Sequence, residues 1–186
     1  MVSSPPCLLV LHGNRQSGEL LLGRINRCLK KLPLAVVAPD APHPHPEDAN
    51  LCTWWKDYEY DGLGESLEVI EKETKDKNIV GILGFSQGAR LTHLLALLHS
   101  QQGWLPQLRF AIICAGYEAP LPSKLTSNDV SLALCSLHIY GTGDALVTPD
   151  ESKALMKYYR NPQTLVHEGS HFVPVQAHRV PIYKKF

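Results

Sequence analysis

The apolar positions of this chain follow two different spacings. Six short runs are almost entirely apolar and rich in β-branched residues or leucine, as is typical of strands buried on both faces. They are residues 7–11, 34–38, 79–83, 110–115, 137–140 and 164–167. Stretches near residues 18–31, 63–77, 89–98 and 151–159 have the spacing or composition of helices, and a short last helix is expected from about Val173. This alternation predicts an α/β fold: a mostly parallel sheet with helices on both faces.

Two long segments show neither spacing. Residues 40–62 are rich in proline, histidine and aromatic residues, and residues 116–132 form a second irregular stretch. We expect both to be surface loops, the first with room for one helical turn, because loops of this length in a compact domain usually carry function. The chain has 186 residues and shows no internal repeat or linker, so we expect one domain spanning residues 1–186.

Composition narrows the possible partners. Lysine plus arginine and aspartate plus glutamate number 18 each, without long blocks of like charge, which argues against nucleic acid or an anionic membrane surface. The five cysteines are widely spaced and form no Cys-x-x-Cys pair, as expected for reduced packing thiols. The first residues lack a positively charged segment and no apolar run approaches membrane-spanning length, so we expect no signal peptide and no transmembrane helix. The sequence therefore predicts a cytoplasmic protein without a membrane span, and leaves the oligomeric state open.

The motif with the most chemical content is Gly84-Phe85-Ser86-Gln87-Gly88, which lies between a predicted strand and a predicted helix. A sharp turn there would present the Ser86 hydroxyl at the end of the sheet, in the arrangement called a nucleophile elbow. The flanking glycines would let the strand and helix approach closely, and the helix N-terminus would favour an anion beside the serine. The pattern alone also fits an ordinary glycine-rich turn, so the rest of the chain has to decide.

A nucleophilic serine needs a base and an acid that orients the base. Asp144 follows the strand at 137–140 and His171 follows the strand at 164–167, so both are expected at the carboxyl edge of the sheet. The chain order Ser86, Asp144, His171 is the order of the α/β-hydrolase fold. Taken singly, each has a structural interpretation, as a turn or capping residue and as a surface imidazole. Their agreement in position and order predicts a catalytic triad.

The tetrahedral intermediate of ester cleavage also needs an oxyanion hole. One donor should be the backbone N–H of Gln87, the residue after the nucleophile. The other should come from the loop after the first strand, where Gly13 permits close approach and the backbone N–H of Asn14 is best placed. We expect His12 to brace this loop.

Two other patterns suggest metal or substrate sites. Residues 167–171 match the zinc-protease pattern His-Glu-x-x-His, which requires a helix. Gly169, Ser170 and the strand before them disfavour a helix there. His43 and His45 with Asp40 are a weak candidate metal site, and a proline-rich turn explains them better. We therefore expect no metal and no cofactor. Trp54 and Trp55 either cap the core or line the acyl pocket, and we assign them to the pocket together with Phe172.

These features together resemble the FSH family of serine hydrolases, small α/β-hydrolases without a large lid domain. The matching segments are residues 9–17, the Trp54-Trp55 pair, and residues 81–89, 141–149 and 169–174. The resemblance implies carboxylesterase-type activity with Ser86, Asp144 and His171 as the triad. The chain departs from the usual patterns at Thr142, where an aspartate often stands, and at Ser170, where a second glycine is usual.

The sequence thus predicts a hydrolase that cleaves small-molecule esters of short to medium acyl chains through an acyl-Ser86 intermediate. A thioesterase or acyl-protein thioesterase would use the same residues, and sequence does not separate the two. A non-catalytic small-molecule binding protein on a hydrolase scaffold is the alternative of another class, against which the intact triad argues.

Overall fold

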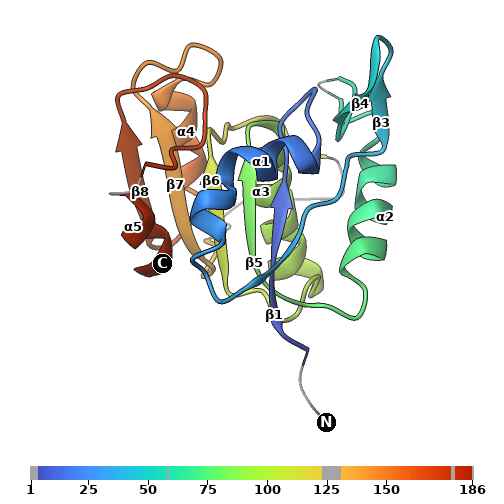
Figure 1. The fold of residues 1–186 in the computed structure, drawn as a ribbon, viewed down its shortest axis with the longest axis horizontal. Helices are drawn as coiled ribbons and strands as arrows, with labels where there is room; N and C mark the ends of the chain where they lie inside the picture. Colours follow the sequence, from blue (N-terminus) through green and yellow to red (C-terminus); the bar gives the residue numbers. More distant parts are fainter. Residues whose placement is uncertain (1–3, 58, 123–130, 177–178, 186) are drawn as a thin grey trace.

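The architecture is taken from a computed structural model, which describes residues 4–57, 59–122, 131–176 and 179–185. Six strands form one sheet in the order β2-β1-β5-β6-β7-β8, and every neighbouring pair is parallel (Figure 1). The strands are β1 (Pro6–Leu11), β2 (Ala35–Val37), β5 (Asn78–Phe85), β6 (Phe110–Cys114), β7 (Cys135–Gly141) and β8 (Pro162–His167). All six predicted strands therefore exist, and the parallel sheet is confirmed.

Five helices within the described residues pack on the two faces of the sheet. They are α1 (Gly18–Leu29), α2 (Leu63–Thr74), α3 (Gln87–Gln102), α4 (Pro149–Met156) and α5 (Val180–Lys185). Side chains alternate across β1: Leu9 and Leu11 join a core cluster with α2, α3 and α4, whereas Leu8 and Val10 join a cluster with α1 and Tyr183 of α5. The strands are apolar on both faces because both faces are packed, as the α/β prediction requires.

Helix α3 lies in the interior along most of its length. Every residue from Gln87 to Leu98 is buried, including the charged side chain of Arg90 and the polar side chain of His93. A helix that is buried all round is held in place by contacts on every side. The residue that caps its start, Ser86, is thus set on a rigid support.

Two expectations from the sequence are wrong. The segment at residues 40–62 is not an irregular loop, because β3 (His43–His45) and β4 (Asp48–Thr53) form an antiparallel pair within it; a two-stranded sheet without a buried interior tolerates Pro44, which obscured the pattern. The last helix begins at Val180 and not near Val173. Residues 123–130 of the second expected loop lie outside the described residues.

The order of the strands changes direction between β1 and β5. The chain passes from β1 to β2 on one side, then crosses back to β5 and continues outward through β6, β7 and β8 (Figure 1). In open parallel sheets, ligands bind beyond the carboxyl ends of the strands at such a reversal. The topology therefore predicts a ligand site at the loops that follow β1 and β5. No helix among the described residues is long and apolar enough to cross a bilayer.

Two buried histidines predict a loss of stability in acid. Burial lowers the pKa of His138 to about 4 and holds the pKa of His93 well below its usual value. The unfolded chain takes up these protons near pH 6.5 whereas the folded chain does not, so stability falls as the pH drops from there. For His138 alone the loss approaches about 3 kcal/mol at pH 4, where the folded state also begins to protonate.

Urea unfolding between pH 7 and pH 4 measures this loss, and His138→Phe is the matched variant. Phenylalanine keeps a ring against Tyr159, which the imidazole contacts edge-on at 4.9 Å between centroids, but does not titrate. The free energy of unfolding should therefore depend less on pH in the variant. An equal pH dependence in both proteins would contradict the assignment.

Candidate active site

Ser86 lies at the turn between β5 and α3 in a backbone conformation that few residues adopt. Its φ is 55° and its ψ is −116°, a strained combination for a residue with a side chain. The turn is held from both sides, since the Ser86 N–H donates to the Cys114 carbonyl at 2.9 Å and the Ser86 carbonyl accepts from the Arg90 N–H at 3.0 Å. The strand, sharp turn and helix of a nucleophile elbow are therefore all present.

The two glycines of the motif are required by close approach. A Cβ atom on Gly84 would overlap the Gly88 carbonyl and the Thr92 hydroxyl, and one on Gly88 would overlap the Leu11 carbonyl. Both sites are closed by backbone atoms, which cannot move aside as a flexible side chain would. The glycines thus allow α3 to sit against β5 and β1.

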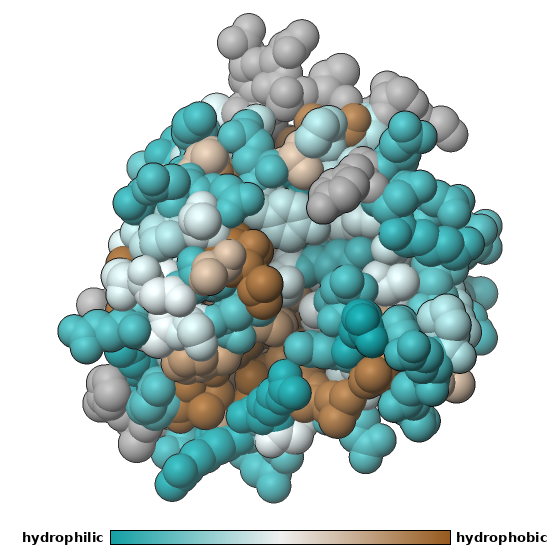
Figure 2. Space-filling view, turned by 90° about the horizontal axis from the view of Figure 1, so that it is seen from above, coloured by the Kyte–Doolittle hydropathy of each residue, from teal (hydrophilic) through white to brown (hydrophobic). Residues whose placement is uncertain are grey.

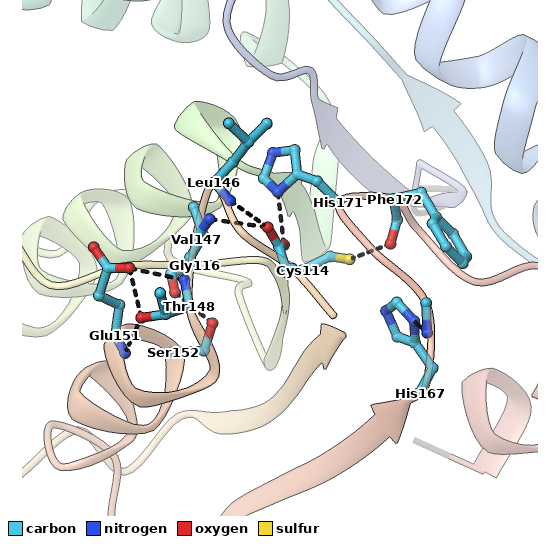
Figure 3. Close-up of polar contacts among 12 residues, drawn as sticks. Cys114, Gly116, Leu146, Val147, Thr148, Glu151, Ser152, His167, His171 and Phe172 are labelled. Atoms are coloured by element: carbon cyan, nitrogen blue, oxygen red, sulfur yellow. Dashed lines mark hydrogen bonds and ion pairs between the residues drawn. The ribbon is translucent and has the colours of Figure 1, made fainter. Parts of the chain in front are cut away.

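Asp144 and His171 are in direct contact. The His171 Nδ1–H donates to Asp144 Oδ2 at 2.7 Å, the dashed line that leaves the His171 ring in Figure 3. The side chain of Asp144 is only 1% exposed. The other carboxylate oxygen accepts the backbone N–H groups of Leu146 and Val147, each at 2.9 Å. A carboxylate held by three donors has a fixed orientation, so it fixes the ring and the tautomer of His171 and leaves Nε2 without the proton.

Backbone hydrogen bonds join the loops that carry this pair. The Thr142 N–H donates to the His167 carbonyl at 2.8 Å, and the Gly143 N–H donates to the Gly169 carbonyl at 3.1 Å. A Cβ on Gly141 would overlap the Gly169 carbonyl, so the loops also lie in close contact. Asp144 and His171 are therefore brought together by main-chain atoms.

Ser86 shares a cleft with His171. The cleft has a volume of about 960 Å³ and is lined by Ser86, Gln87 and His171 together with Asn14. The Phe85 ring lies under the imidazole at 4.8 Å between ring centroids. Among the described residues no hydrogen bond joins the Ser86 hydroxyl to His171, a contact that often tightens only when substrate binds.

The loop after β1 packs directly on the elbow. A Cβ on Gly13 would lie 3.3 Å from the Ser86 Cβ and 3.1 Å from the Phe85 ring, so any larger residue would have to shift one of them by a few tenths of an ångström. The next residue, Asn14, is exposed in the cleft, and no hydrogen bond among the described residues occupies its backbone N–H or that of Gln87. Gln87 begins α3, where a backbone N–H has no partner within the helix. Two free backbone donors thus lie beside Ser86.

His12 braces this loop. Its Nε2 accepts the Ala41 N–H at 3.0 Å and is therefore unprotonated, so its Nδ1–H donates to the Gly13 carbonyl at 2.7 Å. Burial lowers the pKa of His12, although the Gly13 carbonyl and Asp40 act in the opposite direction. A neutral imidazole with both nitrogens engaged has no proton to exchange with substrate, so its role is structural.

The three residues expected in the substrate pocket have different positions. Trp55 lines the cleft, but Trp54 has no exposed surface and its indole N–H donates to the His12 carbonyl at 2.9 Å. The Phe172 ring packs on His167 at 4.7 Å between centroids and points away from the His171 imidazole (Figure 3). Neither Trp54 nor Phe172 lines this cleft, and Trp54 belongs to the core, the alternative that the sequence left open. Figure 2 views the molecule from above, where the strands end, and shows hydrophobic residues beside a hollow bordered by hydrophilic ones.

The sequence model of the FSH1 serine hydrolases matches residues 1–181. The chain belongs to the FSH1 family of serine hydrolases. An esterase of Danio rerio is 31% identical over 224 residues, covering 100% of this chain and 98% of its own length. An esterase of Aedes aegypti is 30% identical over 203 residues, covering 96% of this chain and 74% of its own.

The fold of this FSH1 family member is that of the α/β-hydrolases. The crystal structure of esterase PE8 superposes with a TM-score of 0.72 at 20% identity, covering 99% of this chain and 92% of that one. Within the described residues no large lid domain is inserted between the strands, as expected. The family and the fold predicted from the sequence are both confirmed.

The zinc-protease pattern of this family member lacks the helix it needs. Residue 167 ends β8 and residues 168–172 form bends, so the two imidazoles do not share a helical face. His171 bonds to Asp144, while the His167 Nδ1 accepts the Gly169 N–H at 3.2 Å. In the region that the structure describes, no three His, Cys, Asp or Glu side chains are arranged to hold a metal ion.

Several residues of the site were missed in the sequence. The amides of Leu146 and Val147 hold Asp144, and both residues line the cleft with Tyr117. The buried guanidinium of Arg90 donates to the Tyr60 hydroxyl at 2.8 Å and to the Ala119 carbonyl at 2.6 Å, which ties two loops to α3. One signal was available, because a charged residue inside the otherwise apolar stretch at 89–98 needs buried polar partners.

Proposed function

We propose that this member of the FSH1 family hydrolyses carboxylic esters of short to medium acyl chains through an acyl-Ser86 intermediate. The observation that carries the proposal is the 2.7 Å hydrogen bond from His171 to the buried Asp144, in a cleft that also contains the strained Ser86. An oriented imidazole beside an exposed serine at a helix N-terminus is the minimum apparatus for acyl transfer.

In the proposed first step, the unprotonated Nε2 of His171 takes the Ser86 proton as the oxygen attacks the ester carbonyl. Asp144 stabilises the imidazolium that forms and stays ionised. The backbone N–H groups of Asn14 and Gln87 receive the developing oxyanion, in a position supported by the close packing of Gly13 on Ser86. The imidazolium then gives its proton to the leaving alcohol, and the acyl-enzyme remains.

In the second step, water replaces the alcohol. His171 removes a proton from the water as it attacks the acyl carbonyl, the same amides hold the second oxyanion, and Ser86 leaves with the proton returned by His171. The steps use Ser86, His171, the two backbone N–H groups that line the cleft and the buried Asp144 behind His171. The chemistry therefore needs no cofactor.

The shape of the cleft supports a limit on acyl length. Trp55, Tyr117 and Leu146 give it apolar walls, and Leu146 is 75% exposed, so the walls are low. Each methylene adds about 0.8 kcal/mol, roughly fourfold in kcat/KM, only while it has a wall to touch. We expect kcat/KM on p-nitrophenyl esters to rise from acetyl to between butyryl and octanoyl and then to flatten or fall.

Trp55→Ala should reduce the preference for octanoyl over acetyl esters, because only the longer chain reaches the indole. Trp104→Ala is the matched control, since Trp104 lies beyond the end of α3 and outside the cleft. If kcat/KM of the wild type kept rising with long acyl chains, the size limit would be contradicted. If Trp55→Ala lowered kcat/KM equally for all esters, Trp55 would not be part of the acyl pocket. Matched oxygen and thio esters in the same assay separate an esterase from a thioesterase.

The compartment we propose is the cytoplasm. All five cysteines are free thiols, four of them buried and only Cys135 exposed. Free cysteines in this number are typical of proteins kept in a reducing environment.

A further inference from the structure

The side chain of Gln87 makes contacts that its backbone role does not require. Its Oε1 accepts the Thr53 hydroxyl at 2.8 Å and the Trp54 N–H at 2.9 Å, and its Nε2 donates to the Trp55 carbonyl at 2.9 Å. A backbone N–H can only donate and a carbonyl can only accept, so the orientation of this amide is fixed. Gln87 is 7% exposed, and three side-chain hydrogen bonds join it to residues 53–55.

Trp54, the middle one of these residues, also contacts the loop on the other side of the proposed oxyanion hole. The Trp54 indole N–H donates to the His12 carbonyl at 2.9 Å, and the His12 ring lies 5.0 Å from the indole. His12 in turn bonds the Gly13 carbonyl, which belongs to the peptide group that contains the Asn14 N–H. On its remaining side, Trp54 is tied to α2 by a hydrogen bond from the Ser66 hydroxyl to its carbonyl.

We propose that residues 53–55 are the positioning element of the oxyanion hole, and that Gln87 is a positioning residue through its side chain as well as a donor through its backbone. This segment holds Gln87 directly, and through Trp54 and His12 it is linked to the Gly13–Asn14 peptide group that carries the second donor. The spacing of the two donors is then set before substrate arrives. The inference rests on the proposed function, because it assigns these contacts to the oxyanion hole of that reaction.

A positioning element of the oxyanion hole and a wall of the acyl pocket have different effects on the kinetics. Trp54 has no exposed surface and touches no substrate, so it acts only through the groups it holds. An oxyanion hole acts on every ester and in both acylation and deacylation, whereas a wall acts on long chains. Displaced donors should therefore lower kcat by the same factor for short and long esters and leave KM nearly unchanged.

The central variant is Gln87→Met, which keeps the length of the side chain and removes its three hydrogen bonds. We expect kcat per active site to fall roughly 10- to 100-fold, equally for acetyl and octanoyl esters, because small displacements of catalytic groups have effects of this size. Active sites are counted from the end point of fluorophosphonate labelling, so unfolded protein does not enter the rate. KM should stay within about twofold.

Substitutions of Thr53 test the loss of a single hydrogen bond to Gln87 and its retention by a conservative variant. Thr53→Val removes one of the hydrogen bonds to Gln87 and should lower kcat roughly fivefold, whereas Thr53→Ser keeps the hydroxyl and should stay within about twofold of wild type. Trp54→Phe removes the indole N–H from the His12 carbonyl and should act on kcat in the same way as Gln87→Met. Thr74→Val is the control, because the buried Thr74 hydroxyl bonds only within α2; it should lower stability without changing kcat.

The outcomes are distinct. Gln87→Met or Thr53→Val variants that lose thermal stability but keep wild-type kcat per site would overturn the inference, as would a loss confined to octanoyl esters or to KM. An active wild type is required in each case. A wild type that neither binds the fluorophosphonate nor turns over esters would overturn the proposed function and this inference with it.

Discussion

Ser86→Ala is expected to lower ester hydrolysis by at least roughly 1,000-fold while leaving the fold intact. The hydroxyl oxygen is the proposed nucleophile, and the turn that carries it is held by backbone hydrogen bonds to Cys114 and Arg90, which alanine keeps. The remaining rate would come from the oxyanion donors and from binding alone. kcat on a p-nitrophenyl butyrate substrate measures the loss, and the melting temperature shows that the fold persists.

A fluorophosphonate probe separates this prediction from a binding role. Wild-type protein should form one adduct, located on Ser86 by mass spectrometry, and Ser86→Ala should form none. Folded wild-type protein without an adduct would favour a small-molecule binding protein over a hydrolase. Residual turnover above about a thousandth of wild type in the alanine variant would indicate a different nucleophile.

Asp144→Asn is expected to lower kcat by on the order of 10,000-fold. The carboxylate accepts the His171 Nδ1–H at 2.7 Å, and an amide nitrogen in that position would favour the tautomer with the proton on Nε2, which cannot act as the base. The amide can still accept the Leu146 and Val147 N–H groups through its oxygen. The loop should therefore persist while the base is lost.

Asp150→Asn and Glu151→Gln are the controls for this assignment. Asp150 pairs with Lys153, and Glu151 forms the capping box at the start of α4, so neither contacts His171. Each should keep kcat within a few-fold of wild type. If kcat fell less than tenfold in Asp144→Asn, or fell strongly in either control, the acid of the triad would be another carboxylate.

Much of this fold could be predicted because its strands are buried on both faces. The apolar runs of β1, β5, β6 and β7 have few other interpretations, and their parallel arrangement places whatever follows each strand at one edge of the sheet. The candidate triad could be located for the same reason, since Ser86, Asp144 and His171 each follow a strand. The short hairpin β3-β4 could not, because its residues are largely exposed and carry no periodic pattern.

The directions of individual side chains in the loops could not be predicted from the sequence. Trp54 and Trp55 follow the end of β4 at a bend, and both are buried in the core, but only Trp55 also lines the cleft. Nothing in their identity says which is which. The same holds for Phe172, whose ring turns to His167 because of the bends that follow β8. The roles of Gln87 and Arg90 depend on partners about 30 residues away.

The backbone bonds between the loops of Asp144 and His171 bear on how freely this region tolerates mutation. Main-chain donors and acceptors are the same whatever side chain a position carries, so Thr142 can donate to the His167 carbonyl as well as an aspartate would. Ser170 likewise replaces the usual second glycine without touching the bonds that fix the loop. Substitutions at these two positions should therefore change the stability of the loops little. At Gly141, by contrast, the Gly169 carbonyl leaves no room for a side chain.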